Sequence, residues 1–279
     1  MMEGTETNWE TLIRRFMGAP FWVMLEVEFR RLLRSRKFKV LFLVTFFPDL
    51  IYLLSPNASG SGIDAMLKSF QYLMLDLLPN YWLGIIGQLI AIILMSDLLA
   101  SEIDRGTVRL LISKPVKFGE IIAAKFLAGV GALAVLFGLP YTVIWLYNPI
   151  VYGTGFKGLE EGFTAFLLVL GATLLVLALL GALTMFISVV ISRPLYTALS
   201  SFGLVFLLQY LLPQIPYIKN PGHYTLGYQT VVILKAGFDR VDLSTFSGDP
   251  ARSSLFLMTA LVVFLLLTWG WLRKREFPD

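Results

Sequence analysis

The sequence predicts an all-α protein that is embedded in a membrane. Of its 279 residues, 57% are hydrophobic and only 15% are charged, whereas soluble proteins carry about 25% charged residues. A soluble domain of this size still exposes about a quarter of the surface of its unfolded chain. The mean hydropathy of +0.74 leaves too few polar residues to cover that surface. Lipid is therefore the expected solvent for much of the chain.

The residue inventory excludes several classes of site. The absence of cysteine excludes disulfides, thiolate metal sites and cysteine nucleophiles, and a single histidine, His223, excludes a two-histidine metal site within one chain. The net charge is +4, and the Lys and Arg residues lie mainly at the ends of apolar runs. This distribution indicates membrane topology rather than nucleic-acid binding. We expect no catalytic residues, no metal and no organic cofactor in this chain.

Six stretches are apolar and long enough to cross a membrane, which takes about 20 residues. Pro48 and Asp49 interrupt the first, and the fourth has no charge at all. The predicted spans are 38–54, 81–100, 121–147, 163–191, 195–212 and 254–272. Residues 1–37 precede this six-helix domain, which covers 38–272, and residues 273–279 form a tail.

The positions of the basic residues predict the orientation of the spans. Residues 1–39, the loop after the second span with Lys125, the turn at Arg193 and the tail hold 17 of the 23 Lys and Arg residues. Cytoplasmic segments carry the excess of Lys and Arg in membrane proteins. With an even number of spans, both termini are predicted to be cytoplasmic, in a multi-pass protein of the cell membrane.

The segment before the first span is amphipathic. Asn8 is a candidate N-cap of a short first helix, which Gly18 and Pro20 end. In the stretch that follows, the apolar face comprises Trp22, Leu25, Phe29, Leu32 and Leu33, and the polar face Glu26, Glu28, Arg30, Arg31 and Arg34. Aromatic and basic faces of this kind lie flat in the headgroup region, which we favour over a cytosolic helix packed on a partner protein.

Two outer segments contain further helical patterns. Within residues 55–80, the apolar positions Ile63, Met66, Leu67, Phe70, Leu73, Met74 and Leu77 share one helical face. This face is predicted to rest on the outer membrane surface. Residues 213–252 are rich in Pro, Gly and Tyr around a short apolar stretch at 231–234. A small external helix or a re-entrant hairpin is expected there.

The loop between the second and third spans contains the most informative pattern. Gly106 and Pro115 bracket a short amphipathic helix for which Thr107 is a candidate N-cap. A short transverse helix held between two spans can bind a groove of another protein and transmit its movement. The order in the chain is Glu102, Arg105-Gly106-Thr107, Leu110-Leu111, Pro115-Val116, Glu120 and Lys125.

This loop resembles that of the type-2 ATP-binding cassette (ABC) permeases, a family that includes exporters of drugs, polysaccharides and lipids and the permease that assists nitrous-oxide-reductase maturation. The resemblance implies a coupling helix that docks on a separate ATPase subunit, and it makes residues 1–37 the connecting helix. The implied ATPase-coupling residues are Glu102, Arg105, Gly106, Thr107, Arg109, Leu111, Pro115 and Lys117. It also implies a transport path between two protomers.

The remaining residues agree with an ATPase on a separate chain. No phosphate loop of the Gly-x-x-x-x-Gly-Lys-Ser/Thr type is present, so ATP and Mg²⁺ are expected on a partner subunit. Six spans are half the usual transporter complement, which favours a second permease copy in a C₂ homodimer. The expected partners are thus an ABC ATPase, a second copy and membrane lipid, without nucleic acid.

Polar residues within spans are candidates for a translocation path, and here they are Asp49, Gln88 and Gln209. Asp49 either lines a path or marks an early helix end after Pro48, and the two glutamines either contact substrate or connect helices. Asp97 is expected to pair with Arg105 or Lys125, with a proton relay as the alternative.

The resemblance therefore implies a permease subunit of an ABC exporter, and the mostly apolar faces of the spans favour a hydrophobic or amphipathic substrate. An ion-coupled secondary transporter or a non-pumping membrane assembly factor is the alternative. Neither an inverted repeat nor several mid-membrane charges, which secondary transporters often show, stands out in the chain.

Overall fold

The computed structural model describes residues 20–54, 60–106, 118–214, 223 and 225–274, and every regular element among them is a helix. The predicted short helix after Asn8 and the predicted coupling helix after Thr107 lie outside these residues. The described part of the chain confirms an all-α fold.

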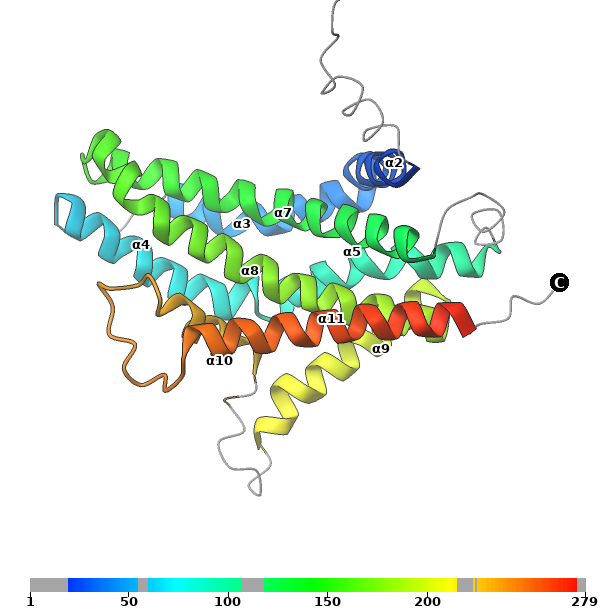
Figure 1. Cartoon of the computed structure of the whole chain (residues 1–279). Helices are drawn as coiled ribbons and strands as arrows, with labels where there is room; N and C mark the ends of the chain where they lie inside the picture. The colour runs from blue at the N-terminus through cyan, green and yellow to red at the C-terminus, as the bar shows by residue number, and fades with distance from the viewer. Residues whose placement is uncertain (1–19, 55–59, 107–117, 215–222, 224, 275–279) are drawn as a thin grey trace, which may run out of the picture.

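A hairpin of two long helices, α7 (Phe118–Val151) and α8 (Gly155–Ile191), forms the centre of the fold (Figure 1). At 1.5 Å per residue these helices are about 50 Å or more in length, longer than the hydrocarbon core of about 30 Å. They therefore extend beyond predicted spans 121–147 and 163–191. α8 packs against α7, α5 (Ile85–Asp104) and α11 (Pro250–Lys274), and 72% of its most apolar segment is buried.

Five helical segments have the length and composition to cross a membrane: α5, α7, α8, α11 and α9 (Pro194–Phe206) with its continuation to Leu211. They correspond to the last five predicted spans. The second predicted span begins four residues too early, because Leu78–Trp82 forms a separate π-helical turn and Gly84 precedes α5. The first, predicted at 38–54, is a helix, α3 (Arg36–Leu54), but it is not among the five.

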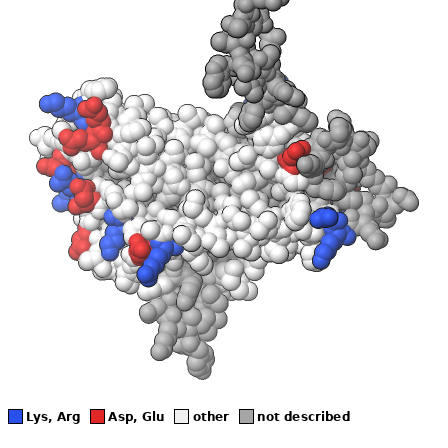
Figure 2. All heavy atoms as spheres, viewed as in Figure 1, with Lys and Arg blue, Asp and Glu red and all other residues white. Residues whose placement is uncertain are grey.

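All predicted cytoplasmic segments that the structure describes lie at one end of the bundle (Figure 1). This "loop end" comprises α2 (Pro20–Arg34), the end of α5, the start of α7 and the end of α11. The opposite "hairpin end" comprises the α7–α8 turn at 152–154 and the start of α4 (Ile63–Leu77). In Figure 2, charged side chains gather towards the two ends of the face in view, and the band between them is uncharged.

Helix α4 confirms the predicted helical face but changes its environment. Met66, Leu67, Phe70 and Met74 are buried, and α4 packs against α7 and α8. The face predicted to rest on the membrane surface therefore contacts protein, because the long α7–α8 hairpin extends far enough to cover it. The small helix predicted around 231–234 is present as α10 (Leu226–Leu234), with Thr225 as its N-cap.

Pro48 lies within α3 without ending it. Proline has no N–H and leaves the carbonyl four residues earlier without its helical partner. The Tyr81 hydroxyl donates to that carbonyl, on Val44, at 2.7 Å, and the Trp82 indole N–H donates to the Thr45 carbonyl at 3.1 Å. The turn before α5 thus satisfies the interrupted helix, and the early helix end considered for Asp49 is wrong.

Candidate functional site

Lys125 is fully buried in the second turn of α7, and two carboxylates hold it. Its Nζ lies 2.7 Å from Glu28 Oε1 and 2.6 Å from Glu102 Oε1. Glu28 belongs to α2 and Glu102 to the last turn of α5. One ammonium group therefore joins three helices at the loop end.

The spacing along α2 explains why Glu28 faces inward. Leu25, Glu28, Phe29 and Leu32 follow the i, i+3, i+4, i+7 pattern of one helical face, and α2 packs against α7 through it. Glu28 was predicted on the polar face, which is wrong, since its side chain is 9% exposed. A buried lysine needs an anionic partner. Two features of the sequence could therefore have revealed this pair: a lysine within a predicted span, and the position of Glu28 on the apolar face of α2.

Arg31 completes a cluster of two cations and two anions. Its guanidinium lies 3.4 Å from Glu28 and 3.7 Å from Glu102, and its side chain is 48% exposed. Each buried carboxylate thus has two cationic neighbours. Removing one member of a buried ion pair leaves an uncompensated charge, at about 3–5 kcal/mol. We call Glu28, Arg31, Glu102 and Lys125 the charge cluster.

The chain leaves α5 directly after the charge cluster. Gly106 adopts φ +69°, the left-handed conformation that ends helices and favours glycine. The Gly106 N–H donates to the Ile103 carbonyl at 3.1 Å and the Arg105 N–H to the Ser101 carbonyl at 3.2 Å. Glu102 lies just before this turn, and Lys125 lies in α7 after the predicted coupling helix. The two residues thus stand on either side of that helix in the chain.

Only part of the predicted coupling set can be placed. Glu102 belongs to the charge cluster, Arg105 is exposed and Gly106 forms the turn. Five of the predicted coupling residues lie outside the described residues: Thr107, Arg109, Leu111, Pro115 and Lys117.

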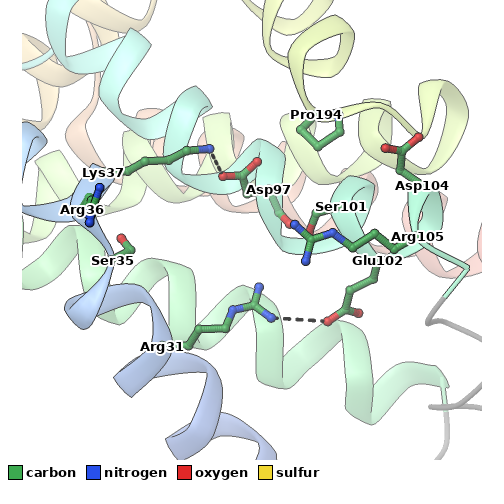
Figure 3. A pocket seen from close by; sticks show the side chains of 10 residues that line it. All are labelled: Arg31, Ser35, Arg36, Lys37, Asp97, Ser101, Glu102, Asp104, Arg105 and Pro194. Atoms are coloured by element: carbon green, nitrogen blue, oxygen red, sulfur yellow. Dashed lines mark hydrogen bonds and ion pairs between the residues drawn. The ribbon is translucent and has the colours of Figure 1, made fainter.

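Asp97 forms a second contact between helices at this end. Its carboxylate pairs with Lys37 of α3 (Figure 3), so the partners expected from the sequence, Arg105 and Lys125, are wrong. Lys37 is 60 positions away from Asp97 in the chain, so no local sequence pattern predicts this pair. Arg193, before α9, lies 4.0 Å from Asp104 at the end of α5.

The remaining α2 residues predicted at the interface are exposed to different degrees. Trp22 is 41% exposed, Arg30 pairs with Glu26 one turn earlier, and Arg34 is exposed. The helix thus combines an inward face bound to α7 with an outward face that carries basic groups, and the partly exposed Trp22 lines a groove between α2 and α7. Its position in the headgroup region stays a prediction.

The three candidate path residues have different surroundings. Asp49 is fully buried, and neither carboxylate oxygen has a hydrogen-bond partner among the described residues. The Gln88 amide donates to the Leu83 carbonyl at 2.8 Å, and Gln209 Oε1 accepts from the Leu226 N–H at 3.3 Å. Both glutamines thus make contacts of the kind that connect elements. The role of all three in transport stays a prediction.

Residues 22–272 match the family model described as "ABC-2 family transporter protein". The matched range begins in α2 and ends in α11, so it includes both the amphipathic helix and the whole bundle. No curated protein matches the chain.

Proposed function

The chain belongs to the ABC-2 transporter family and is a transmembrane permease subunit, and on this premise we propose that it serves an exporter. ATP would be hydrolysed, with Mg²⁺, on a separate ATPase subunit, and the substrate would be hydrophobic or amphipathic. Export rests on the sequence resemblance, and the substrate class on the mostly apolar faces of the spans. The charge cluster is the observation that carries the proposal of mechanical coupling.

The charge cluster joins the segments through which an ATPase would act. The predicted coupling segment starts after Gly106, four residues beyond Glu102, and the described chain resumes at Phe118, seven residues before Lys125. A displacement of the segment therefore acts on α5 and α7 together, while Glu28 connects α2 to the same point. Since a buried ion network has a high cost of breaking, the three helices are proposed to move as a unit.

We propose α3 as the sixth span, with both termini cytoplasmic. Its exposed apolar residues form a stripe along the helix: Val40, Leu43, Phe47, Leu50, Ile51 and Leu54. Thr45 and Asp49 face inward and are buried. An apolar outer stripe with an inward polar side is expected of a helix between lipid and a bundle. This adds a span beside α5 and α7, against which α3 packs.

We propose that a second copy covers part of α9. Only 17% of the most apolar segment of α9 and its continuation is buried, and this helix diverges from the bundle in Figure 1. The transport path would then run between two copies. Because the chain has no cysteine, a Leu199→Cys variant tests this: dimer-specific disulfide crosslinking in membranes is expected, and a strictly monomeric product contradicts it.

Co-purification with the ABC ATPase subunit expected for this permease tests the coupling proposal. The wild type is expected to retain the ATPase, and Arg109→Glu to lose most of it, because the charge reversal falls within the predicted docking segment. Arg252→Glu, an equal reversal on the predicted outer side, is the matched control. Gly106→Pro tests the turn, since proline cannot adopt φ +69°.

Two results would contradict the proposed function. One is that no ATPase co-purifies with wild type and ATP never stimulates transport in reconstituted vesicles. The other is that Arg109→Glu and Arg252→Glu retain the ATPase equally. Transport driven by an ion gradient alone would instead favour the secondary transporter.

A further inference from the structure

A cleft of about 660 Å³ opens at the loop end beside the charge cluster, two members of which, Arg31 and Glu102, form part of its lining (Figure 3). Its walls come from the α2–α3 junction, the last turns of α5 and the start of α9 at Pro194. The basic residues that line it are Arg31, Arg36, Lys37 and Arg105, and the acidic ones are Asp97, Glu102 and Asp104. This volume accommodates a phosphate group with its substituent.

Cations exceed carboxylates around this cleft. Each lining carboxylate has a cationic partner within the protein: Asp97 pairs with Lys37, Glu102 with Lys125 and Asp104 with Arg193. Arg36 and Arg105 have no acidic partner among the described residues, and both are exposed. In Figure 3 the two come from different walls, and the Arg105 side chain extends along the cleft. Two guanidinium groups are thus available for an anion from outside the chain.

Beyond the cleft, towards the start of α5, the exposed side of this helix is apolar. Ile86 and Ile93 are exposed, and Asp97 lies on the same helical face, at spacings of 7 and 4 residues. Helices α3 and α9 both pack against α5, and each carries an exposed apolar side chain near the cleft, Val40 at 61% and Leu195 at 69%. An occupant of the cleft would therefore meet charge at one end and hydrocarbon along the bundle.

We propose that this cleft binds the headgroup of an anionic phospholipid from the leaflet at the loop end. Arg36 and Arg105 would hold the phosphodiester, since arginine binds phosphate oxygens in a bidentate manner. One acyl chain would follow the Ile86–Ile93 face of α5. Basic pockets between membrane helices bind anionic headgroups, whereas a soluble anion gains nothing from the apolar surface. The site is independent of whether lipid is also the cargo.

The test is native mass spectrometry of the full-length protein in detergent, titrated with dioleoyl phosphatidylglycerol or dioleoyl phosphatidylcholine. The wild type is expected to bind phosphatidylglycerol at least fivefold more tightly than phosphatidylcholine. The double variant Arg36→Ala/Arg105→Ala is expected to lose this preference. Arg273→Ala/Lys274→Ala is the matched control, because it removes two cations from the same end outside the cleft and should retain the preference.

Further measurements distinguish a lipid headgroup from a soluble phosphate and from a protein partner. Dihexanoyl phosphatidylglycerol is expected to bind more weakly than the dioleoyl lipid, because its chains reach less of α5. Displacement of the lipid by inorganic phosphate at equal concentration would overturn the proposal, since the site would then serve a soluble anion. Displacement by the ATPase subunit would also overturn it, because the cleft would then be a protein contact.

Equal losses in the two double variants would overturn the proposal as well, because they would show a general surface attraction. Gel filtration and thermal midpoints without added lipid show whether both variants fold. Should Arg36→Ala/Arg105→Ala not fold, Arg36→Gln/Arg105→Gln is measured in its place, with the same expected loss.

Discussion

The two ends of the bundle hold their elements together by different means. At the loop end, Lys125, Glu28 and Glu102 are 0%, 9% and 13% exposed. At the hairpin end, Arg240 pairs with Asp64 at 3.0 Å, but these side chains are 42% and 82% exposed. The distances are similar, whereas access to water is not.

This difference shows that burial, rather than distance, decides what an ion pair does. Exposed pairs contribute about 0–1 kcal/mol, so Arg240 and Asp64 can separate at little cost. Breaking a buried pair costs about 3–5 kcal/mol. The loop end is therefore expected to behave as one mechanical unit, and the hairpin end to tolerate rearrangement.

The hairpin end relies instead on a buried amide. Gln71 of α4 is 1% exposed. Its Nε2 donates to Asp239 at 3.1 Å, and its Oε1 accepts from the Arg240 N–H at 2.9 Å. A buried neutral side chain thus attaches the loop after α10 to α4, beside the exposed pair of Arg240 and Asp64.

The largest expected effect is that of Lys125→Met, which replaces the charged side chain with an apolar one of similar length. The variant leaves Glu28 and Glu102 buried with only Arg31 near them, at a cost of about 3–5 kcal/mol. The midpoint of thermal unfolding in detergent, measured by tryptophan fluorescence, is expected to fall clearly. Glu28→Gln/Glu102→Gln/Lys125→Met should recover most of the loss, since no buried charge remains unpaired and the Arg31 side chain, 48% exposed, can be solvated by water. A midpoint equal to that of Arg240→Met would contradict the contrast between the two ends.

An intermediate effect is expected for Gln71→Leu, which removes two hydrogen bonds from the hairpin end. The loss is about 1–3 kcal/mol, and it should increase hydrogen exchange in residues 235–243 while leaving α2 unchanged. Gln214→Leu, at an exposed position, is the control and should change neither. Increased exchange in α2 as well would show that the two ends are not independent.

The smallest effect is expected from acid. The hydrogen bond from Gln71 lowers the pKa of Asp239 below its ordinary value of 3.8. A carboxyl whose pKa is lower in the folded state contributes stability above its unfolded pKa, and the contribution is lost as pH falls through the folded pKa. Protection factors of residues 235–243 are therefore expected to decrease below about pH 4, and less so in Asp239→Asn. An identical acid response in that variant would exclude Asp239 as the cause.

The bundle was largely predictable because the apolar composition of each membrane helix is visible within its own stretch of sequence. The apolar runs marked α5, α7, α8, α9 and α11, and the face of Ile63–Leu77 marked α4. The exact ends of the helices were not predictable. α7 and α8 pack against each other, and both continue as helix beyond the apolar run that marked them. The Pro48 interruption was visible, but the side chains that satisfy it, Tyr81 and Trp82, were not.

The candidate site was predictable only where it is local. Glu102, Gly106 and Lys125 were recognisable within one loop, while Glu28 and Lys37 were placed with solvent-facing or basic groups. Both of these contact residues more than 50 positions away in the chain. Whether a charged residue on an amphipathic helix faces water or a buried lysine depends on how that helix is rotated on its neighbour.

The sequence by itself determined the membrane solvent, the all-α class, the grouping of basic residues on one side and the family. These properties follow from composition and short spacing, which act along the chain. The tertiary structure alone decided that Lys125 joins α2, α5 and α7, and that Arg36 and Arg105 have no acidic partner in the part of the chain that the structure describes. The physical reason is that an ion pair depends on distance and burial, and both are set when the helices pack.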